Sequence, residues 1–124
     1  MIKKVLVVDD NRISRELIQE VLSSSEQQVV EAENGEDALK MIVNEKPDVV
    51  LLDIQLPVYD GYEVLRRIRS DLGLEKLPVI ALTAYAMEQD HEKAVAAGFD
   101  DYITKPVDGG ALRARIKEIL NNRV

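Results

Sequence analysis

The sequence predicts an α/β fold in which a parallel sheet is covered by helices on both faces. Short aliphatic runs recur along the chain, and the run at 49–52 suits a strand that is buried on both faces. Each run is followed by a segment of helical period, so five strand–helix pairs alternate strictly. This alternation favours parallel strands that are joined by right-handed crossovers.

The first half of the chain holds three predicted strands and two helices. A strand at 5–8 leads into a helix over 11–23, for which Asp10 or Asn11 is a suitable N-cap. A modest strand at 28–32 and a helix over 36–45, ended by Pro47, precede the central strand at 49–52. The apolar residues that we expect to face inward from these two helices are Leu17, Ile18, Val21, Leu22, Ala38, Leu39, Ile42 and Val43.

The second half continues the alternation. A helix over 62–70 turns its aliphatic residues inward and its arginines outward, and a strand at 78–82 follows. The helix over 87–97 has a mostly alanine apolar face, buries little area and ends at Gly98, a suitable C-cap. A short strand at 101–104 and a helix over 111–121, with an apolar stripe from Leu112 to Leu120, complete the pattern.

Composition narrows the class of protein. A chain of 124 residues suits one domain, which we expect to span 1–124, and a net charge of -7 argues against unaided nucleic-acid binding. The chain has no cysteine, which excludes disulfides, thiolate metal sites and a cysteine nucleophile. No apolar run is long enough for a signal peptide or for membrane insertion, so we expect a cytoplasmic protein.

Polar residues follow four of the five predicted strands: Asp9 and Asp10, then Asp53, Thr83 and Lys105. The second predicted strand, at 28–32, is not clearly followed by such a residue. The carboxyl ends of parallel strands meet at one edge of a sheet, so these side chains should converge. Three close carboxylates favour a hard divalent cation such as Mg²⁺, and the lysine and hydroxyl suit a phosphoryl group. An ionised Asp53 needs no general base to act as the nucleophile.

Simpler explanations exist for each residue taken alone. Asp9 and Asp10 can cap a helix, and Asp53 can be a solvated loop acid. Thr83 can be an ordinary strand-end threonine, and Lys105 can be a turn residue before Pro106. The specificity lies in their occurrence together, in this order, on an alternating α/β pattern.

The chain resembles the CheY-like receiver domains of two-component response regulators along essentially its whole length. The motifs that carry the resemblance are Val7-Val8-Asp9-Asp10-Asn11, Leu51-Leu52-Asp53-Ile54-Gln55-Leu56-Pro57-Val58-Tyr59-Asp60-Gly61, Leu82-Thr83-Ala84-Tyr85 and Tyr102-Ile103-Thr104-Lys105-Pro106. The resemblance implies a flavodoxin-like (βα)5 three-layer sandwich with strand order 2-1-3-4-5. Leu56 is a mild departure, since many members have methionine there.

The resemblance also implies a phosphorelay function. Asp53 would accept a phosphoryl group from a phosphohistidine on a sensor histidine kinase or a histidine phosphotransfer protein. Asp10, Asp53 and the backbone carbonyl of Gln55 would bind Mg²⁺ directly, and Asp9 would act through a bound water. Such a domain catalyses only its own phosphorylation and dephosphorylation.

Further implied roles concern the phosphoryl oxygens and the output. Thr83, Lys105 and the backbone N–H of Ala84 would contact the phosphoryl oxygens, and the Lys105–Pro106 bond would be cis. Tyr102 would be a switch that follows Thr83. It would alter the surface formed by the fourth helix (87–97), the fifth strand (101–104) and the fifth helix (111–121) for a downstream protein target. A phosphorylation-dependent homodimer through that surface stays open.

Other functions compete with a stand-alone receiver. A receiver fragment of a larger regulator or of a hybrid histidine kinase would have the same sequence features. A Mg²⁺-dependent phosphohydrolase with an aspartyl-phosphate intermediate would need a second acid or base, and none is evident. A flavodoxin-like cofactor binder would need a glycine-rich loop after the first strand, where Asp9 and Asp10 stand instead. The intact set of site residues argues against a degenerate receiver.

Overall fold

Ten elements alternate along the chain in the computed structural model, which describes residues 2–23, 27–84 and 87–121. The strands are β1 (Lys3–Val8), β2 (Gln27–Ala32), β3 (Val49–Asp53), β4 (Val79–Thr83) and β5 (Asp101–Thr104). The helices are α1 (Arg12–Leu22), α2 (Gly35–Glu45), α3 (Gly61–Arg69), α4 (Glu88–Ala97) and α5 (Gly109–Asn121). Tyr85, which belongs to the third motif above, lies outside the described residues.

The five strands form one parallel sheet in the order β2-β1-β3-β4-β5, as predicted. The register aligns the carboxyl ends of the strands, because Val8 lies opposite Leu52 and Thr83 lies opposite Thr104. Residues that follow these positions in sequence therefore emerge at one edge of the sheet.

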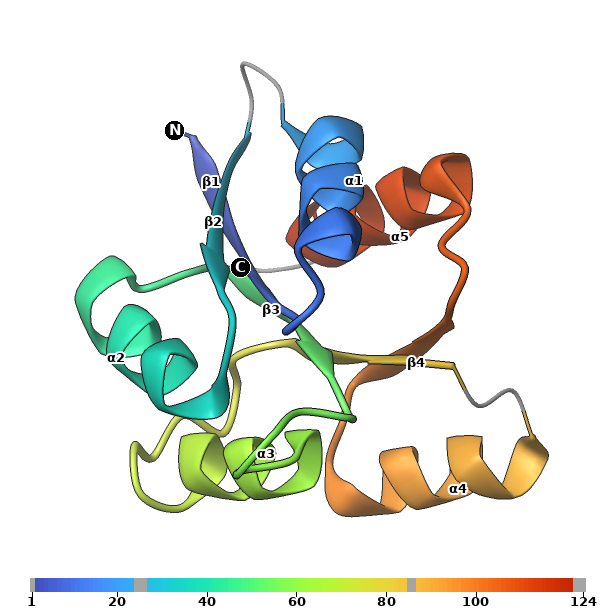
Figure 1. Ribbon diagram of the computed structural model, residues 1–124. Helices are drawn as coiled ribbons and strands as arrows, with labels where there is room; N and C mark the ends of the chain where they lie inside the picture. Colours follow the sequence, from blue (N-terminus) through green and yellow to red (C-terminus); the bar gives the residue numbers. More distant parts are fainter. Residues whose placement is uncertain (1, 24–26, 85–86, 122–124) are drawn as a thin grey trace.

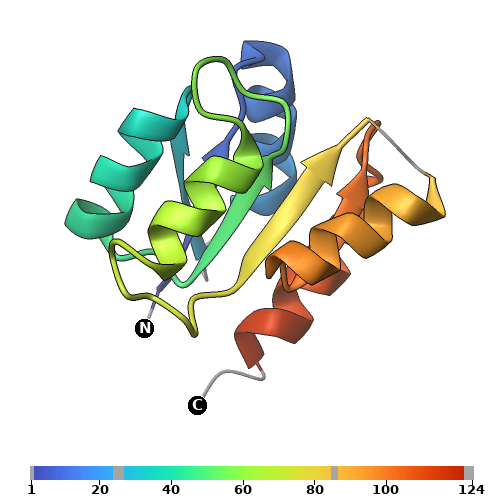
Figure 2. The same cartoon turned by 90° about the horizontal axis from the view of Figure 1, so that it is seen from below.

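Helices cover both faces of the sheet, which gives three layers (Figure 1; Figure 2). Helices α1 and α5 lie on one face, and α2, α3 and α4 lie on the other. Side chains alternate across β1, so that Val5 and Val7 pack beneath α1 and α5 while Leu6 and Val8 pack against α2 and α3. Two apolar cores therefore hold the sheet, and β3 and β4 are buried along their whole lengths.

Two apolar residues that we expected to face inward are exposed. Leu17 is 47% exposed and Val43 is 54% exposed, while their neighbours Ile18 and Ile42 are buried. Consecutive residues lie about 100° apart around a helix, so each exposed residue points away from the sheet while its buried neighbour faces it. The buried face of each helix is therefore narrower than its run of apolar residues suggests. Arg69 is also not turned freely outward, because its guanidinium bonds the backbone of the α3–β4 loop and Asp100.

Side-chain caps fix the helix starts on either side of the sheet edge. The Asn11 side chain accepts the N–H of Ser14 at the start of α1, and the Asp60 side chain accepts that of Glu63 at the start of α3. Asp10 and Asn11 are both suitable caps by sequence, and in the structure Asn11 is the N-cap of α1. Among the described residues, helix α4 has no side-chain cap and buries only Ala94, which agrees with the small buried area expected for it. No helix within the described ranges is long and apolar enough to cross a bilayer.

Candidate functional site at the carboxyl edge of the sheet

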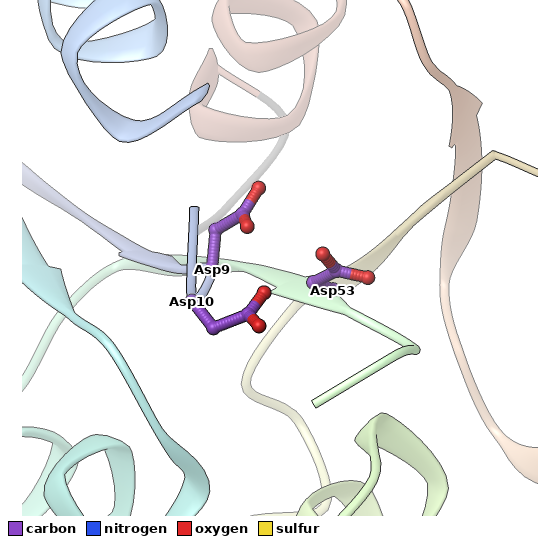
Figure 3. A group of neighbouring side chains, drawn as sticks. All are labelled: Asp9, Asp10 and Asp53. Carbon is purple, nitrogen blue, oxygen red and sulfur yellow. The ribbon is translucent and has the colours of Figure 1, made fainter. Parts of the chain in front are cut away.

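Three carboxylates converge where β1 and β3 end (Figure 3). Asp9 and Asp10 follow β1, Asp53 is the last residue of β3, and an oxygen from each lies within 4.8 Å of the others. Asp9 and Asp53 are buried, whereas Asp10 is exposed. The sequence prediction that these acids share one edge is confirmed geometrically, and together they form the acidic cluster of the site.

Lys105 reaches the acidic cluster from the loop after β5. Its Nζ donates hydrogen bonds to Oδ2 of Asp9 and to Oδ2 of Asp53, each at 2.7 Å. Its backbone N–H donates to the carbonyl oxygen of Thr83 at 2.7 Å, which fastens the loop to the end of β4. The peptide bond from Lys105 to Pro106 is cis, as the resemblance implied.

Burial and neighbouring charges have opposite effects on the pKa values of Asp53 and Lys105. Desolvation by burial raises the pKa of the Asp53 carboxyl above its ordinary value, with a further rise from Asp9, and the hydrogen bonds from Lys105 and from Gln55 N–H only partly offset it. Desolvation lowers the pKa of the Lys105 ammonium, but the hydrogen bonds to Asp53 and Asp9 outweigh it and raise the pKa overall. Relative to the unfolded chain, the folded state therefore favours the charged form of Lys105 and the protonated form of Asp53.

The donor set suits a hard divalent cation. Three carboxylates and one ammonium leave two negative charges when all four groups are ionised, which matches the charge of Mg²⁺. Within the described residues, the Asp10 carboxylate has no hydrogen bond or ion pair, so its oxygens are available as ligands. The residues present therefore fit the magnesium site that the sequence predicts.

The loop after β3 approaches the strand end closely. The N–H of Gln55 donates to Oδ1 of Asp53 at 2.8 Å, and the N–H of Gly61 donates to the carbonyl oxygen of Ile54 at 2.7 Å. A Cβ at Gly61 would lie 2.6 Å from Cα of Ile54 and 2.7 Å from the carbonyl oxygen of Asp53, so only glycine fits there. Val58, at the exposed tip, has a φ of 67°, which is unfavourable for a β-branched residue.

Thr83 and Tyr102 lie at the β4–β5 side of the site. Thr83 ends β4 and is buried, and Ala84 follows it at the exposed edge. The Tyr102 ring stacks on the ring of His91 in α4, with centroids 4.9 Å apart and planes 15° apart. Burial raises the pKa of the Tyr102 hydroxyl, Asp90 adds to the rise, and Thr83 acts in the opposite direction. Tyr102 therefore contacts α4 on one side and lies within electrostatic reach of Thr83.

One residue bound to the site was missed by the sequence analysis. Arg15 of α1 donates from Nη1 to the backbone carbonyl of Asp9 at 2.7 Å. Its own sequence neighbourhood is an ordinary amphipathic helix, so no local signal marks it. The contact becomes evident only when β1, β2 and α1 are assembled.

Comparisons with known proteins agree with this geometry. The family profile of the response regulator receiver domain matches residues 5–117. The chain is 35% identical over 122 residues to the polar-differentiation response regulator DivK of Brucella anthropi, covering 98% of this chain and 99% of DivK. It is 41% identical over 118 residues to the phosphate regulon transcriptional regulatory protein PhoB of Pseudomonas aeruginosa, covering 95% of this chain but 52% of PhoB.

Solved structures show the same relationship. The BeF3-activated N-terminal receiver domain of RstA from Klebsiella pneumoniae superposes with a TM-score of 0.87 at 33% identity, covering 97% of this chain and 100% of that one. Receiver domains act in phosphorelay signalling, are phosphorylated on aspartate and generally bind Mg²⁺ through an acidic cluster. This chain belongs to the family of response regulator receiver domains and functions in phosphorelay signal transduction.

Proposed function

We propose that Asp53 is the phosphoacceptor, and that its donor is a phosphohistidine of a sensor histidine kinase or of a histidine phosphotransfer protein. The observation that carries this proposal is the setting of its carboxylate. One oxygen accepts the Lys105 Nζ at 2.7 Å, the other accepts the Gln55 N–H at 2.8 Å, and two further acids lie beside it. A nucleophile fixed in this way is already oriented for attack.

In the proposed step, an oxygen of Asp53 forms a bond to phosphorus while the P–N bond of the donor breaks. The bonding electron pair of the P–N bond stays on the imidazole nitrogen, so the products are an acyl phosphate and a free histidine. Lys105, the Thr83 hydroxyl and the Ala84 N–H would then contact the phosphoryl oxygens. These groups stabilise negative charge on the transferred group, which is the main contribution that a protein makes to phosphoryl transfer.

The magnesium ligands in this proposal are Asp10, Asp53 and the backbone carbonyl of Gln55, with Asp9 acting through a water. When bound, Mg²⁺ would neutralise charge on the carboxylates and on the incoming phosphoryl oxygens. The exposed Asp10 lies on the solvent side of the cluster, where a partly hydrated ion can be held.

The proposed output is a shift of α4, β5 and α5 toward a surface that binds a downstream protein target. A phosphoryl group that draws Thr83 and Lys105 toward itself would change the surroundings of Tyr102, whose ring rests on His91 of α4. Helix α4 lies against β5 (Figure 2) and buries only Ala94, so a modest bias can move it.

The remaining proposals concern the setting of the domain. We propose a cytoplasmic receiver domain over 1–124 that contacts proteins and not nucleic acid directly, in line with its net charge of -7. The same surface of α4, β5 and α5 is the candidate face for a phosphorylation-dependent homodimer. The domain catalyses only its own phosphorylation and dephosphorylation.

The test is intact mass after incubation with acetyl phosphate and Mg²⁺. The wild type should gain one phosphoryl group, and Asp53→Asn and a chelator-treated sample should gain none. Asp60→Asn is the matched control, because it changes an acid in the same loop and retains a side chain that can cap α3. Labelling of Asp53→Asn would refute the proposal. Donor consumption without any adduct would instead support a phosphohydrolase.

A further inference from the structure

We propose that Arg15 is a positioning residue for the acidic cluster. It holds the backbone of Asp9 in place, and through it the turn that carries both Asp9 and Asp10. The inference rests on the proposed magnesium site, since the benefit of this positioning is the affinity of the cluster for the cation. Arg15 itself binds neither the metal nor the phosphoryl group.

The Arg15 guanidinium joins three separate groups. Nη1 donates to the Asp9 carbonyl oxygen at 2.7 Å, Nε donates to Oε1 of Glu31 at 3.0 Å, and Nη2 lies 3.9 Å from Oε2 of Glu33. The side chain is only 12% exposed. A planar guanidinium can satisfy such divergent acceptors at once, which a single ammonium cannot do with the same geometry.

The backbone of Asp9 is consequently held from both sides. Its N–H donates to the carbonyl oxygen of Ala32 in β2 at 3.1 Å, and its carbonyl accepts from Arg15. Oδ1 of Asp9 also accepts the N–H of Asn11 at 2.9 Å, which closes the turn around Asp10. Because the Asp10 side chain makes no hydrogen bond within the described residues, its position depends on this backbone.

This arrangement gives β2 a role in the site. No side chain of β2 belongs to the acidic cluster, although the other four strands each bring a residue to it or to its edge. Glu31 in β2 and Glu33 just beyond it hold Arg15 instead, and Arg15 holds Asp9. The second strand therefore supports the acidic cluster through an arginine that does not enter it.

A positioning role and a purely electrostatic role of Arg15 predict opposite changes in Mg²⁺ affinity when the residue is replaced. If its cationic charge were what mattered, removing it would leave the cluster more negative and would tighten Mg²⁺ binding. If it positions Asp9 and Asp10, removing it would loosen the turn and weaken binding. Loss of an outer-layer residue that orients a metal site typically lowers metal affinity by about 10-fold to 100-fold.

The experiment is calorimetric titration of Mg²⁺ into the unphosphorylated protein, with amide NMR to follow Asp10. Arg15→Met should bind Mg²⁺ about 10-fold to 100-fold more weakly than the wild type and should shift or broaden the Asp10 amide. Arg15→Lys retains the positive charge but loses the planar set of guanidinium donors, so this variant should also bind Mg²⁺ more weakly. Arg12→Met is the matched control, because Arg12 lies on the same helix, is 82% exposed and pairs only with Glu16 among the described residues.

Each outcome decides the question. Unchanged or tighter Mg²⁺ binding by folded Arg15→Met, or wild-type affinity in Arg15→Lys, would overturn the inference. A lower melting temperature with unchanged affinity would show that Arg15 only supports the fold. If Arg15→Met fails to fold, the Arg15→Lys titration decides alone. If the wild type binds no Mg²⁺, the proposed magnesium site fails and this inference fails with it.

Discussion

Gly61→Ala should damage both the stability and the chemistry of the domain, because the added methyl group meets backbone atoms. The new Cβ would lie 2.6 Å from Cα of Ile54 and 2.7 Å from the carbonyl oxygen of Asp53. Neither atom belongs to a flexible side chain, so the strand end or the start of α3 must move. The hydrogen bond from Gly61 N–H to the Ile54 carbonyl, at 2.7 Å, joins the same two segments and would be strained as well.

The expected size of the effect follows from the clash and the length of the chain. Forcing an extra methyl group into a filled space costs about 1–3 kcal/mol. An unfolding entropy of about 2.1 cal/mol/K per residue gives about 0.26 kcal/mol/K for 124 residues, so Tm should fall by about 4–12 °C. A displacement of Asp53 approaching 1 Å would slow phosphorylation by about 10-fold to 100-fold.

The assay pairs thermal unfolding with the initial rate of labelling by acetyl phosphate. Gly110→Ala is the matched control, since its Cβ would meet nothing nearer than Oδ1 of Asp108 at 3.5 Å. That change, in the first turn of α5, should not lower stability, because alanine has the higher helix propensity, and it should leave labelling unchanged. A Gly61→Ala variant as stable and as rapidly labelled as the wild type would refute the steric argument.

Three further predictions concern the same edge of the sheet. Val58→Gly should raise the free energy of unfolding by about 1 kcal/mol in urea, because relief of a 67° φ outweighs the added chain entropy; a decrease would contradict this. Burial raises the pKa of Asp53, so the folded state binds its proton more tightly than the unfolded state does. Metal-free Asp53→Asn should therefore be more stable than the wild type at pH 7, by about 1.4 kcal/mol per pKa unit, and this advantage should shrink as pH falls through the raised pKa toward 3.8. If the stability difference between Asp53→Asn and the wild type grew as pH fell, the pKa of Asp53 could not be raised by folding. Lys105→Gln removes the cation that holds down the pKa of Asp53, so ¹³C NMR titration of that carboxyl should show a further rise; an unchanged pKa would mean that Lys105 does not act on it.

The strand-end residues could be predicted because they depend on topology alone. Once Asp9, Asp53 and Lys105 are seen to follow strands of a parallel sheet, their convergence requires only that those strands be neighbours with aligned ends. The central strand was equally predictable, because its unbroken aliphatic run is typical of burial on both faces.

Contacts that depend on register and on helix rotation could not be predicted. The link from Arg15 to Glu31 requires the pairing of β1 with β2, in which Val7 lies opposite Glu31, and also the rotation of α1. The stack of His91 on Tyr102 requires the placement of α4 against β5, and our sequence analysis did not anticipate it.

Helix faces were also only partly predictable. Where two apolar residues are adjacent, as Leu17 and Ile18 are, the sequence does not show which of them faces the sheet. That choice depends on the angle at which the helix packs. The positive φ of Val58 has no signal in a valine, because this conformation is usually adopted by glycine.

The phosphoryl group should reside on Asp53, and borohydride reduction of the labelled protein identifies the residue that carries it. Borohydride converts an aspartyl phosphate to homoserine, and peptide mass spectrometry then identifies the residue that changed. After labelling in the presence of Mg²⁺, we expect homoserine at position 53 and at no other acid of the cluster. Homoserine at position 9 or 10, or its absence from a protein whose intact mass shows the adduct, would contradict the assignment.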